Sequence, residues 1–275
     1  MKKKRIIPVI LLKNGWIVQS FGFKEHTKLG NPIKILERLS KWMSDEVIYL
    51  DISKDKNYSL DRDDLNEKNE FKNFKQIIKY VSKKSLNPIT FGGSIKKIKQ
   101  IEDYLYLGAD KISINSVCIE NKNFISEAAK AFGSQCIICS IDYIKKGNTY
   151  KIVYKGNKIL NVDLFDWIKK CEDSGCGEIL LNSVERDGIK NGFDLNTIKS
   201  VLKKINIPTI MCGGAGEPKH FYDAFSKTKI EALAASNLFN HIEHGDYVIK
   251  KYLYEKSINV RNPSFFNRDN FIKEL

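Results

Sequence analysis

Residues 208–216 read PTIMCGGAG, and residues 88–94 read PITFGGS. Each stretch is a short run of strand-forming residues that ends in a Gly-Gly turn. Short apolar runs bounded by turn residues are typical of buried strands in a parallel sheet. Because the same strand and turn occur twice, about half a chain apart, the pattern indicates an internal repeat.

Three further pairs of similar segments occur in the same order and support this repeat. They are LDIS (50–53) with LLNS (180–183), INS (114–116) with ASN (235–237), and the run from Ile7 to Lys13-Asn-Gly15 with the run from Ile138 to Lys146-Gly147. Each match is short when taken alone. Four matches in one order, all at strand ends, predict two half-barrels of four βα units each.

Short apolar runs alternate with amphipathic stretches along the whole chain. The predicted strands are Arg5–Leu12, Glu46–Asp51, Pro88–Phe91, Lys111–Ile114, Cys136–Asp142, Glu178–Asn182, Pro208–Cys212 and Glu231–Ala235. The predicted helices are Ile33–Met43, Phe74–Lys84, Ile95–Leu107, Asn123–Phe132, Leu164–Ser174, Leu195–Lys204 and Pro218–Phe225. Apolar strands joined by helical crossovers form parallel sheets, and eight such units predict an α/β fold of the (β/α)8 TIM-barrel type.

The composition sets limits on the class of protein. The chain has 275 residues, of which 42% are hydrophobic, so a largely disordered protein is excluded. Ile6–Leu12 follows a basic start, but the run is short, Lys13 ends it and no cleavage site follows, so we expect a buried strand and not a signal peptide. The six cysteines have neither disulfide-framework nor zinc spacing, which favours reduced thiols in a cytoplasmic protein.

The formal net charge of +13 raises the question of nucleic-acid binding. The lysines are scattered through every segment, and the sequence contains no RNP motif, zinc finger or basic helix-turn-helix. We therefore expect no nucleic-acid partner and no membrane partner. A basic surface favours phosphorylated or acidic small ligands instead.

One domain is expected over residues 1–261. The separation in sequence between matching segments of the two halves is smaller for the later pairs than for LDIS and LLNS. This difference predicts an insertion in the first half. The charged stretch near 53–73, SKDKNYSLDRDDLNEKNEFKN, is the clearest place for a long loop. Residues 262–275 are expected to form a C-terminal tail, in which Phe265, Phe266 and Phe271 could contact a partner or cover the barrel, or which could be disordered.

Barrel active sites lie at the carboxyl ends of the strands, and two glycine turns are expected there. Glycine lets backbone N–H groups approach an anion closely. The predicted phosphate-binding residues are Gly92, Gly93, Ser94, Asn115 and Ser116 in the first half, and Gly213, Gly214, Ala235 and Ser236 in the second. For each pair, a plain tight turn between strand and helix is the alternative.

Asp142 ends the fifth strand on the same face as Ile138 and Ser140, so it is predicted to point into the mouth. A lone carboxylate there is a candidate general acid or base, and a capping role is its alternative. The equivalent position of the first half is Leu11, which cannot move a proton. Asp51 and Asp187 are further carboxylates expected near the mouth, and Asp187-Gly188 is predicted to lie in a loop that folds over a phosphorylated ligand.

Four charged residues stand at the starts of strands: Arg5, Glu46, Lys111 and Glu178. Strand alternation places Arg5, Lys111 and Glu178 inside the barrel, where buried charges are tolerated only in pairs. For any one of the four taken alone, a place on the surface is the alternative. They therefore predict a salt-bridged ring at the barrel floor. His241 and His244 have a spacing that suits a metal, but with only two other histidines in the chain we expect neither a metal nor a cofactor.

Several of these segments together resemble the HisF family, the cyclase subunit of imidazole glycerol phosphate synthase. In chain order they are KRII (4–7), YLDI (49–52), GADKISIN (108–115), FGSQ (132–135), GEILL (177–181), RDG (186–188), GGAG (213–216) and LAAS (233–236). The resemblance implies a glutaminase partner of the HisH type, docked on the barrel floor, whose ammonia passes through the barrel. It also implies that the four floor residues form the ammonia gate and that Asp110 lies near the partner interface.

The mouth departs from the HisF pattern. HisF uses two catalytic aspartates, of which one matches Asp142 and the other matches Leu11. Ser94 replaces the third glycine of a phosphate turn, and Gln19 replaces a lysine that contacts the substrate phosphate. An intact ammonia route with impaired cyclase chemistry resembles a HisF-like branch linked to surface-sugar biosynthesis.

In that branch, ammonia is thought to serve a sugar amidotransferase that forms an acetamidino group. The expected function is therefore an ammonia-channelling subunit of a glutamine amidotransferase system. One alternative is a genuine cyclase of histidine biosynthesis, with Asp142 acting alone or helped by Asp51. The other is a barrel that binds a phosphorylated ligand without catalysis.

Overall fold

The computed structural model describes residues 2–30, 44–53, 58, 71–242 and 244–263. Within these ranges, no helix is both long enough and apolar enough to cross a membrane. The predicted helix Ile33–Met43, most of the charged loop near 53–73 and most of the tail 262–275 lie outside the described residues. Tyr58 and Phe71, near the two ends of the charged loop, are buried against the core.

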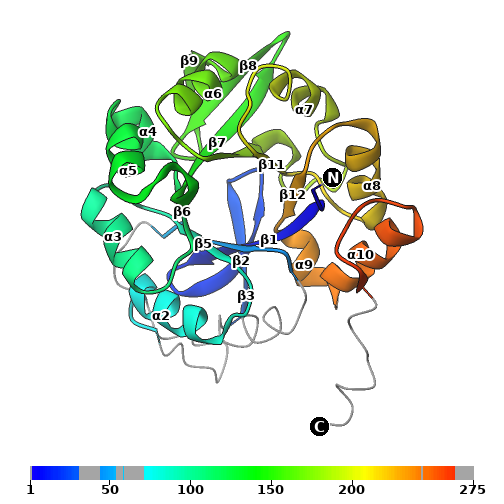
Figure 1. Ribbon diagram of the computed structural model, residues 1–275, viewed down its shortest axis with the longest axis horizontal. Helices are drawn as coiled ribbons and strands as arrows, with labels where there is room; N and C mark the ends of the chain where they lie inside the picture. Colours follow the sequence, from blue (N-terminus) through cyan, green and yellow to red (C-terminus); the bar gives the residue numbers. More distant parts are fainter. Residues whose placement is uncertain (1, 31–43, 54–57, 59–70, 243, 264–275) are drawn as a thin grey trace.

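Eight parallel strands form a closed barrel with helices around it, which confirms the predicted fold (Figure 1). The strands are β1 (Arg5–Lys13), β4 (Val47–Asp51), β5 (Ile89–Gly92), β6 (Lys111–Ile114), β7 (Ile137–Lys146), β10 (Glu178–Ser183), β11 (Thr209–Cys212) and β12 (Ala232–Ala235). Each strand pairs with its neighbour in order, and the parallel pairing of β10 with β7 completes the ring together with that of β12 with β1.

Most of the side chains that point into the barrel form their own apolar cluster, while Thr90 and Ser140 are buried polar side chains on the same faces. It consists of Ile7, Val9, Ile48, Ile138, Leu180, Ile210, Ala232 and Ala234, with the partly buried Leu11, Leu50 and Cys212 at its edge. Alternate residues of the same strands point outward and pack beneath the helices in a second, larger core. The period of two along each strand thus separates a narrow interior column from the layer between barrel and helices.

Most of the predicted crossover helices are present with bounds close to those expected. They are α2 (Phe74–Lys84), α3 (Ile98–Tyr106), α5 (Phe124–Phe132), α6 (Leu164–Asp173), α7 (Leu195–Val201) and α8 (Pro218–Lys227). The N-caps explain two of the starts, because the side chains of Asn73 and Asp163 accept hydrogen bonds from first-turn N–H groups. The short helices α4 (Ser116–Glu120) and α9 (Asn237–His241), and the longer α10 (Gly245–Glu255), were not predicted.

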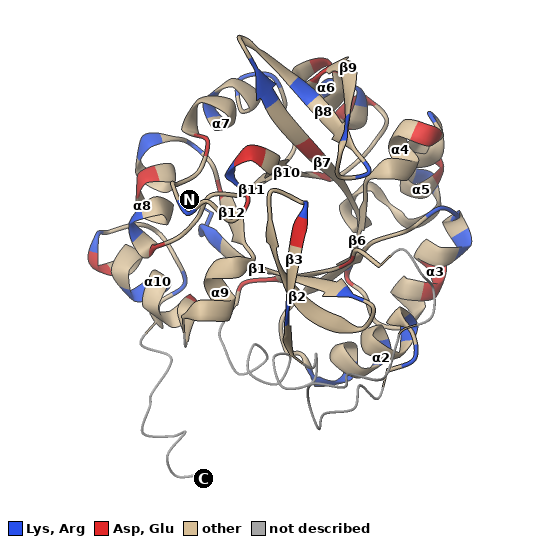
Figure 2. Ribbon diagram, turned by 180° about the vertical axis from the view of Figure 1, so that it is seen from behind, with Lys and Arg blue, Asp and Glu red and all other residues tan. Residues whose placement is uncertain are grey.

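Two β-hairpins were also not predicted, and they strengthen the case for a repeat. The strands β2 (Trp16–Phe21) and β3 (Glu25–Gly30) follow β1, whereas β8 (Thr149–Tyr154) and β9 (Lys158–Asp163) follow β7. Each hairpin pairs antiparallel with the first strand of its half-barrel, which is why β7 extends beyond the predicted end at Asp142. The β2–β3 hairpin crosses the centre of the ring in both views (Figures 1 and 2).

The basic residues are spread over many helices of the outer ring and do not form one stripe (Figure 2). This distribution agrees with the scatter of lysines along the sequence. The six cysteines are free thiols, of which Cys118, Cys139, Cys171 and Cys176 are buried.

Candidate functional site

Asp142 lies at the mouth, where β7 leaves the barrel, and both of its carboxylate oxygens accept hydrogen bonds. Asn182 donates from Nδ2 to Oδ1 at 2.8 Å, and Asn115 donates from Nδ2 to Oδ2 at 2.8 Å. The same Nδ2 of Asn182 lies 3.1 Å from the hydroxyl of Ser140. The two amides come from strand ends on either side of β7, so the barrel closure itself holds the carboxylate in one orientation.

The surroundings of Asp142 favour its protonated form. Burial and the charge of Asp187 together raise the pKa of this carboxyl to about 6. The hydrogen bonds from Asn182 and Asn115 offset only part of this rise. Its hydrogen-bond partners are neutral amides, which stabilise the anion less than a cation would. A carboxyl with a pKa near neutrality suits proton transfer, because it can hold a proton and release it.

The equivalent position of β1 holds no carboxylate. Leu11 packs on the apolar interior cluster, at the same level of its half-barrel as Asp142 in the other half. Asp51 does not compensate, because it lies on the opposite face of β4 from the inward-facing Leu50. Its carboxylate accepts hydrogen bonds from Ser53 and from the hydroxyl of Tyr58, 2.9 Å away. The expectation that Asp51 supplements the mouth is therefore wrong.

The glycine turns are required by the packing of the backbone. A Cβ added at Gly93 would lie 2.0 Å from the carbonyl oxygen of Asp51, and one added at Gly214 would lie 2.1 Å from that of Gly192. Both residues also have positive φ, which disfavours other residues. The fold therefore explains these glycines without a ligand, and phosphate binding stays a prediction.

One polar atom beside the second turn still lacks a partner. The hydroxyl of Ser236 is buried, and no described residue forms a hydrogen bond with it. Buried hydroxyl groups are normally hydrogen-bonded, so an unmatched one beside a glycine turn is consistent with a ligand contact.

Asp187 ties the β2–β3 hairpin to the mouth. Its Oδ2 accepts hydrogen bonds from the Ser20 hydroxyl at 2.7 Å and from the Phe23 N–H at 3.2 Å, while its carbonyl accepts from the N–H of Gly22. Burial raises the pKa of Asp187, although these hydrogen bonds lower it. The carboxylate of Asp187 thus binds the β2–β3 hairpin, and the neighbouring Gly188 packs against Phe21 of the same hairpin. On the same hairpin, Gln19 lies 3.0 Å from the ring nitrogen of His241.

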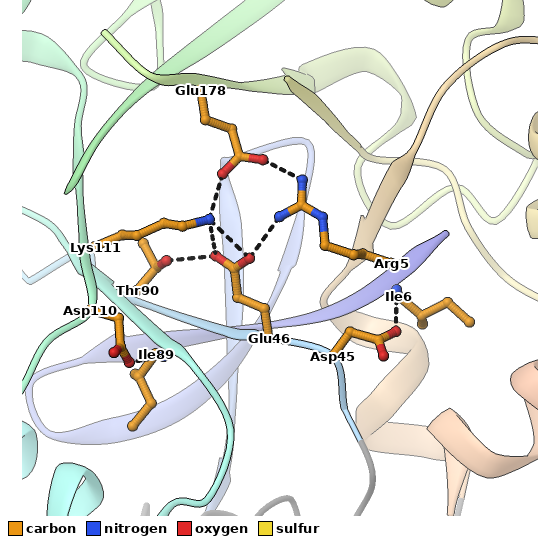
Figure 3. Close-up of polar contacts among 9 residues, drawn as sticks. All are labelled: Arg5, Ile6, Asp45, Glu46, Ile89, Thr90, Asp110, Lys111 and Glu178. Atoms are coloured by element: carbon orange, nitrogen blue, oxygen red, sulfur yellow. Dashed lines mark hydrogen bonds and ion pairs between the residues drawn. The ribbon is translucent and has the colours of Figure 1, made fainter. Parts of the chain in front are cut away.

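At the other end of the barrel, four charged side chains form a closed ring of alternating sign (Figure 3). Arg5 contacts Glu46 at 2.9 Å and also contacts Glu178. Lys111 contacts Glu178 at 2.8 Å and Glu46 at 3.3 Å. This arrangement confirms the predicted ion pairing, and each acid lies between two bases.

The ring is closely coupled to the surrounding protein. Thr90 donates a hydrogen bond to Glu46 at 2.8 Å, and both glutamates are buried. Burial alone would raise the pKa of Glu178, but the charges of Arg5 and Lys111 outweigh burial and lower that pKa. Beside Lys111, the exposed Asp110 accepts a hydrogen bond from the Ile89 N–H at 2.8 Å, and its predicted role at a partner interface stays a prediction.

The histidine spacing forms no metal site in the structure. His241 is the last residue of α9, and His244 is the N-cap of α10 with a left-handed backbone. In the described ranges, no group of three or more His, Cys, Asp or Glu side chains could hold a metal ion.

Comparisons with known proteins place this geometry in context. The family model described as "Histidine biosynthesis protein" matches residues 5–243. A Vibrio vulnificus protein described as "putative imidazole glycerol phosphate synthase subunit hisF2" is 38% identical over 272 residues, covering 98% of this chain and 96% of the relative. The imidazole glycerol phosphate synthase subunit HisF of Clostridium botulinum is 36% identical over 264 residues, covering 95% and 100%, and that of Dehalococcoides mccartyi is 33% identical over 262 residues, covering 95% and 99%.

Replacing Asp142 by Asn should change how stability depends on pH. The folded carboxyl has a pKa of about 6, above its ordinary 3.8, so the folded state binds the proton more tightly than the unfolded state. The wild type should therefore gain stability relative to Asp142→Asn as pH falls from 7 to 4, by at most about 3 kcal/mol. Urea unfolding of both proteins across this range measures the gain, and a constant difference would contradict it.

Replacing Lys111 by Met should lower the free energy of unfolding by about 3 kcal/mol at pH 7, because it leaves two buried carboxylates facing one guanidinium. Lys99→Met is the matched control, since this lysine on α3 has 71% of its side chain exposed. The control should stay within about 0.5 kcal/mol of wild type. Equal stabilities of the two variants in urea unfolding would show that the ring is not a coupled unit.

Proposed function

The chain belongs to the HisF family of histidine-biosynthesis proteins, and from this premise we propose that it is the ammonia-receiving subunit of a glutamine amidotransferase system. A glutaminase of the HisH type docks on the barrel floor and releases ammonia, which passes through the barrel to the mouth. The observation that carries this proposal is the ring of Arg5, Glu46, Lys111 and Glu178 beneath a mainly apolar interior column.

An apolar column above a charged ring suits the passage of ammonia. A neutral molecule enters an apolar space at far lower cost than its protonated, charged form, so the column selects ammonia over ammonium. The ring closes the floor without net charge, because its two positive and two negative side chains compensate each other. Asp110, exposed beside Lys111, would face the docked glutaminase.

The mouth favours a role other than ring closure. Asp142 is oriented and has a pKa near neutrality, but its symmetric counterpart is Leu11. A relative with the name hisF2 is consistent with a second protein of this type beside an ordinary HisF. We propose that the ammonia serves a sugar amidotransferase, which forms an acetamidino group on a nucleotide-activated surface sugar. In this role Asp142 and the glycine turns organise the mouth or bind a phosphorylated ligand.

The second candidate is a genuine imidazole glycerol phosphate synthase cyclase subunit. Its support is the retained environment of Asp142, with Asn115 and Asn182 in place, together with the names of the HisF relatives. The third candidate is a barrel that binds a phosphorylated ligand without catalysis, through the backbone of Gly213 and Gly214 and the unpartnered hydroxyl of Ser236. The cyclase alternative leaves Leu11 at the second carboxylate position unexplained, and the ligand-binding alternative leaves the floor ring unexplained.

Assaying the purified chain with an ammonium salt and the cyclase substrate tests the ring-closure chemistry. That substrate is the phosphoribulosyl-formimino aminoimidazole carboxamide ribonucleotide. Loss of one acid–base group typically lowers turnover by about 10²–10⁴-fold, so we expect that deficit relative to the Clostridium botulinum HisF assayed alongside. Leu11→Asp should recover part of it. Wild-type turnover equal to that of the comparison enzyme would make this chain a histidine-pathway cyclase.

A labelling experiment tests the passage of ammonia. The chain, a HisH-type glutaminase and a sugar amidotransferase with its nucleotide-linked N-acetyl sugar are supplied with glutamine labelled with heavy nitrogen in the amide, and with unlabelled ammonium. The share of product nitrogen that comes from glutamine should be high for wild type and for Lys99→Met. Lys111→Met should lower this share, because it removes one of the two cations that close the ring. An unchanged share would remove the main support for the proposed function.

A further inference from the structure

A second polar cluster lies beside the charged ring, between the barrel and the outer helices. It consists of Ser44 and Asp45, which precede β4, and of Asp246 and Lys250 on α10. Lys250 is only 2% exposed, and Ser44 and Asp246 are fully buried. Lysine is almost never buried this deeply unless it is paired, so the partner of Lys250 indicates what the residue does.

One partner of the buried lysine is Asp45. The ammonium group of Lys250 lies 2.9 Å from Oδ1 of this aspartate, whose side chain is itself 8% exposed. Arg261, whose side chain is half exposed, lies 3.6 Å from the same oxygen. Within the cluster, the Ser44 hydroxyl donates a hydrogen bond to Asp246. Two cations therefore face one oxygen of Asp45 and fix the direction of the carboxylate.

The other oxygen of Asp45 joins two strands of the barrel floor. Oδ2 accepts a hydrogen bond from the Ile6 N–H at 3.0 Å (Figure 3). The backbone register between β1 and β4 begins only at Val9 and Ile48. On the opposite side of β1, the Arg5 N–H bonds to the carbonyl of Glu231. The carboxylate of Asp45 thus supplies, at the floor end of β1, a link to the β4 segment where the sheet provides none.

This link lies next to both halves of an ion pair in the ring. Ile6 follows Arg5 in the chain, and Glu46 follows Asp45, while Arg5 and Glu46 contact each other at 2.9 Å. A shift of the Asp45 carboxylate would therefore move the backbone next to both ring residues. An ion pair at this distance loses its hydrogen-bond geometry with a displacement of well under 1 Å.

We infer that Lys250 is a positioning residue for the floor ring: it holds Asp45, and Asp45 keeps Arg5 and Glu46 in register for the transfer of ammonia. This inference rests on the proposed function of the ring. It assigns a functional task to a buried ion pair, because the burial of such a pair is by itself weak evidence for a role in stability.

The test uses Lys250→Met, which keeps the length of the side chain and removes its charge. Lys251→Met is the matched control, because this neighbouring lysine of α10 is exposed. In the reconstituted system with heavy-nitrogen glutamine and unlabelled ammonium, Lys250→Met should lower the glutamine-derived share of product nitrogen as Lys111→Met does. Turnover with ammonium alone should stay within about twofold of wild type, whereas a merely structural defect would lower both activities together.

Asp45→Asn decides the question if Lys250→Met does not fold. This variant keeps an acceptor for the Ile6 N–H and removes the charge that faces Lys250, and it should lower the same share. A wild-type share in the folded variant overturns the inference, as does an equal loss of both activities. Lys111→Met distinguishes failure of this inference from failure of the proposed function. If Lys111→Met lowers the glutamine-derived share while Lys250→Met and Asp45→Asn do not, the inference fails and the proposed function stands.

Discussion

The pairing of buried charges at the barrel floor is the constraint on which the rest of this structure depends. Glu46 and Glu178 are both buried, and a carboxylate in such a place is tolerable only with well-placed cations. Arg5 and Lys111 supply these cations from two other strands, so the ring fixes four strands relative to one another. The floor can therefore be charged and closed, while the column above it stays apolar.

The two ends of the column show how differently one fold can treat charge. At the floor, opposite charges compensate each other, and the carboxyl of Glu178 has a lowered pKa. At the mouth, Asp142 has only neutral amide donors, and burial raises its pKa to about 6. The carboxyl of Glu178 therefore keeps its charge at neutral pH, whereas the mouth holds a group that can exchange a proton.

The repeat of half-barrels makes the departures from symmetry informative. Both halves carry a hairpin after their first strand and a glycine turn at a later strand end. Symmetry would place a carboxylate at both Leu11 and Asp142, but only one is present. The β2–β3 hairpin is tied to the mouth through Asp187, which thus has a structural task whatever its role toward a ligand. The asymmetry lies at the mouth, while the floor ring draws its four residues from both halves.

The sequence by itself determined the barrel, because apolar strands with a period of two residues alternate with amphipathic helices with a period of about 3.6 residues. The strand period also placed Arg5, Lys111 and Glu178 inside the barrel. The two hairpins were not predicted, although Asn14-Gly15, which lies between the apolar run Ile6–Leu12 and Trp16–Val18, is a typical two-residue hairpin turn. Strand alternation also turns Asp51 away from the mouth, because this residue directly follows the inward-facing Leu50. Only the tertiary structure brought Lys250 to Asp45. Which face a strand buries is a local property that sequence records. The partner of a buried charge can come from a distant part of the chain: Lys250 lies 205 residues after Asp45. Only the packing of α10 against the barrel brings the two side chains together.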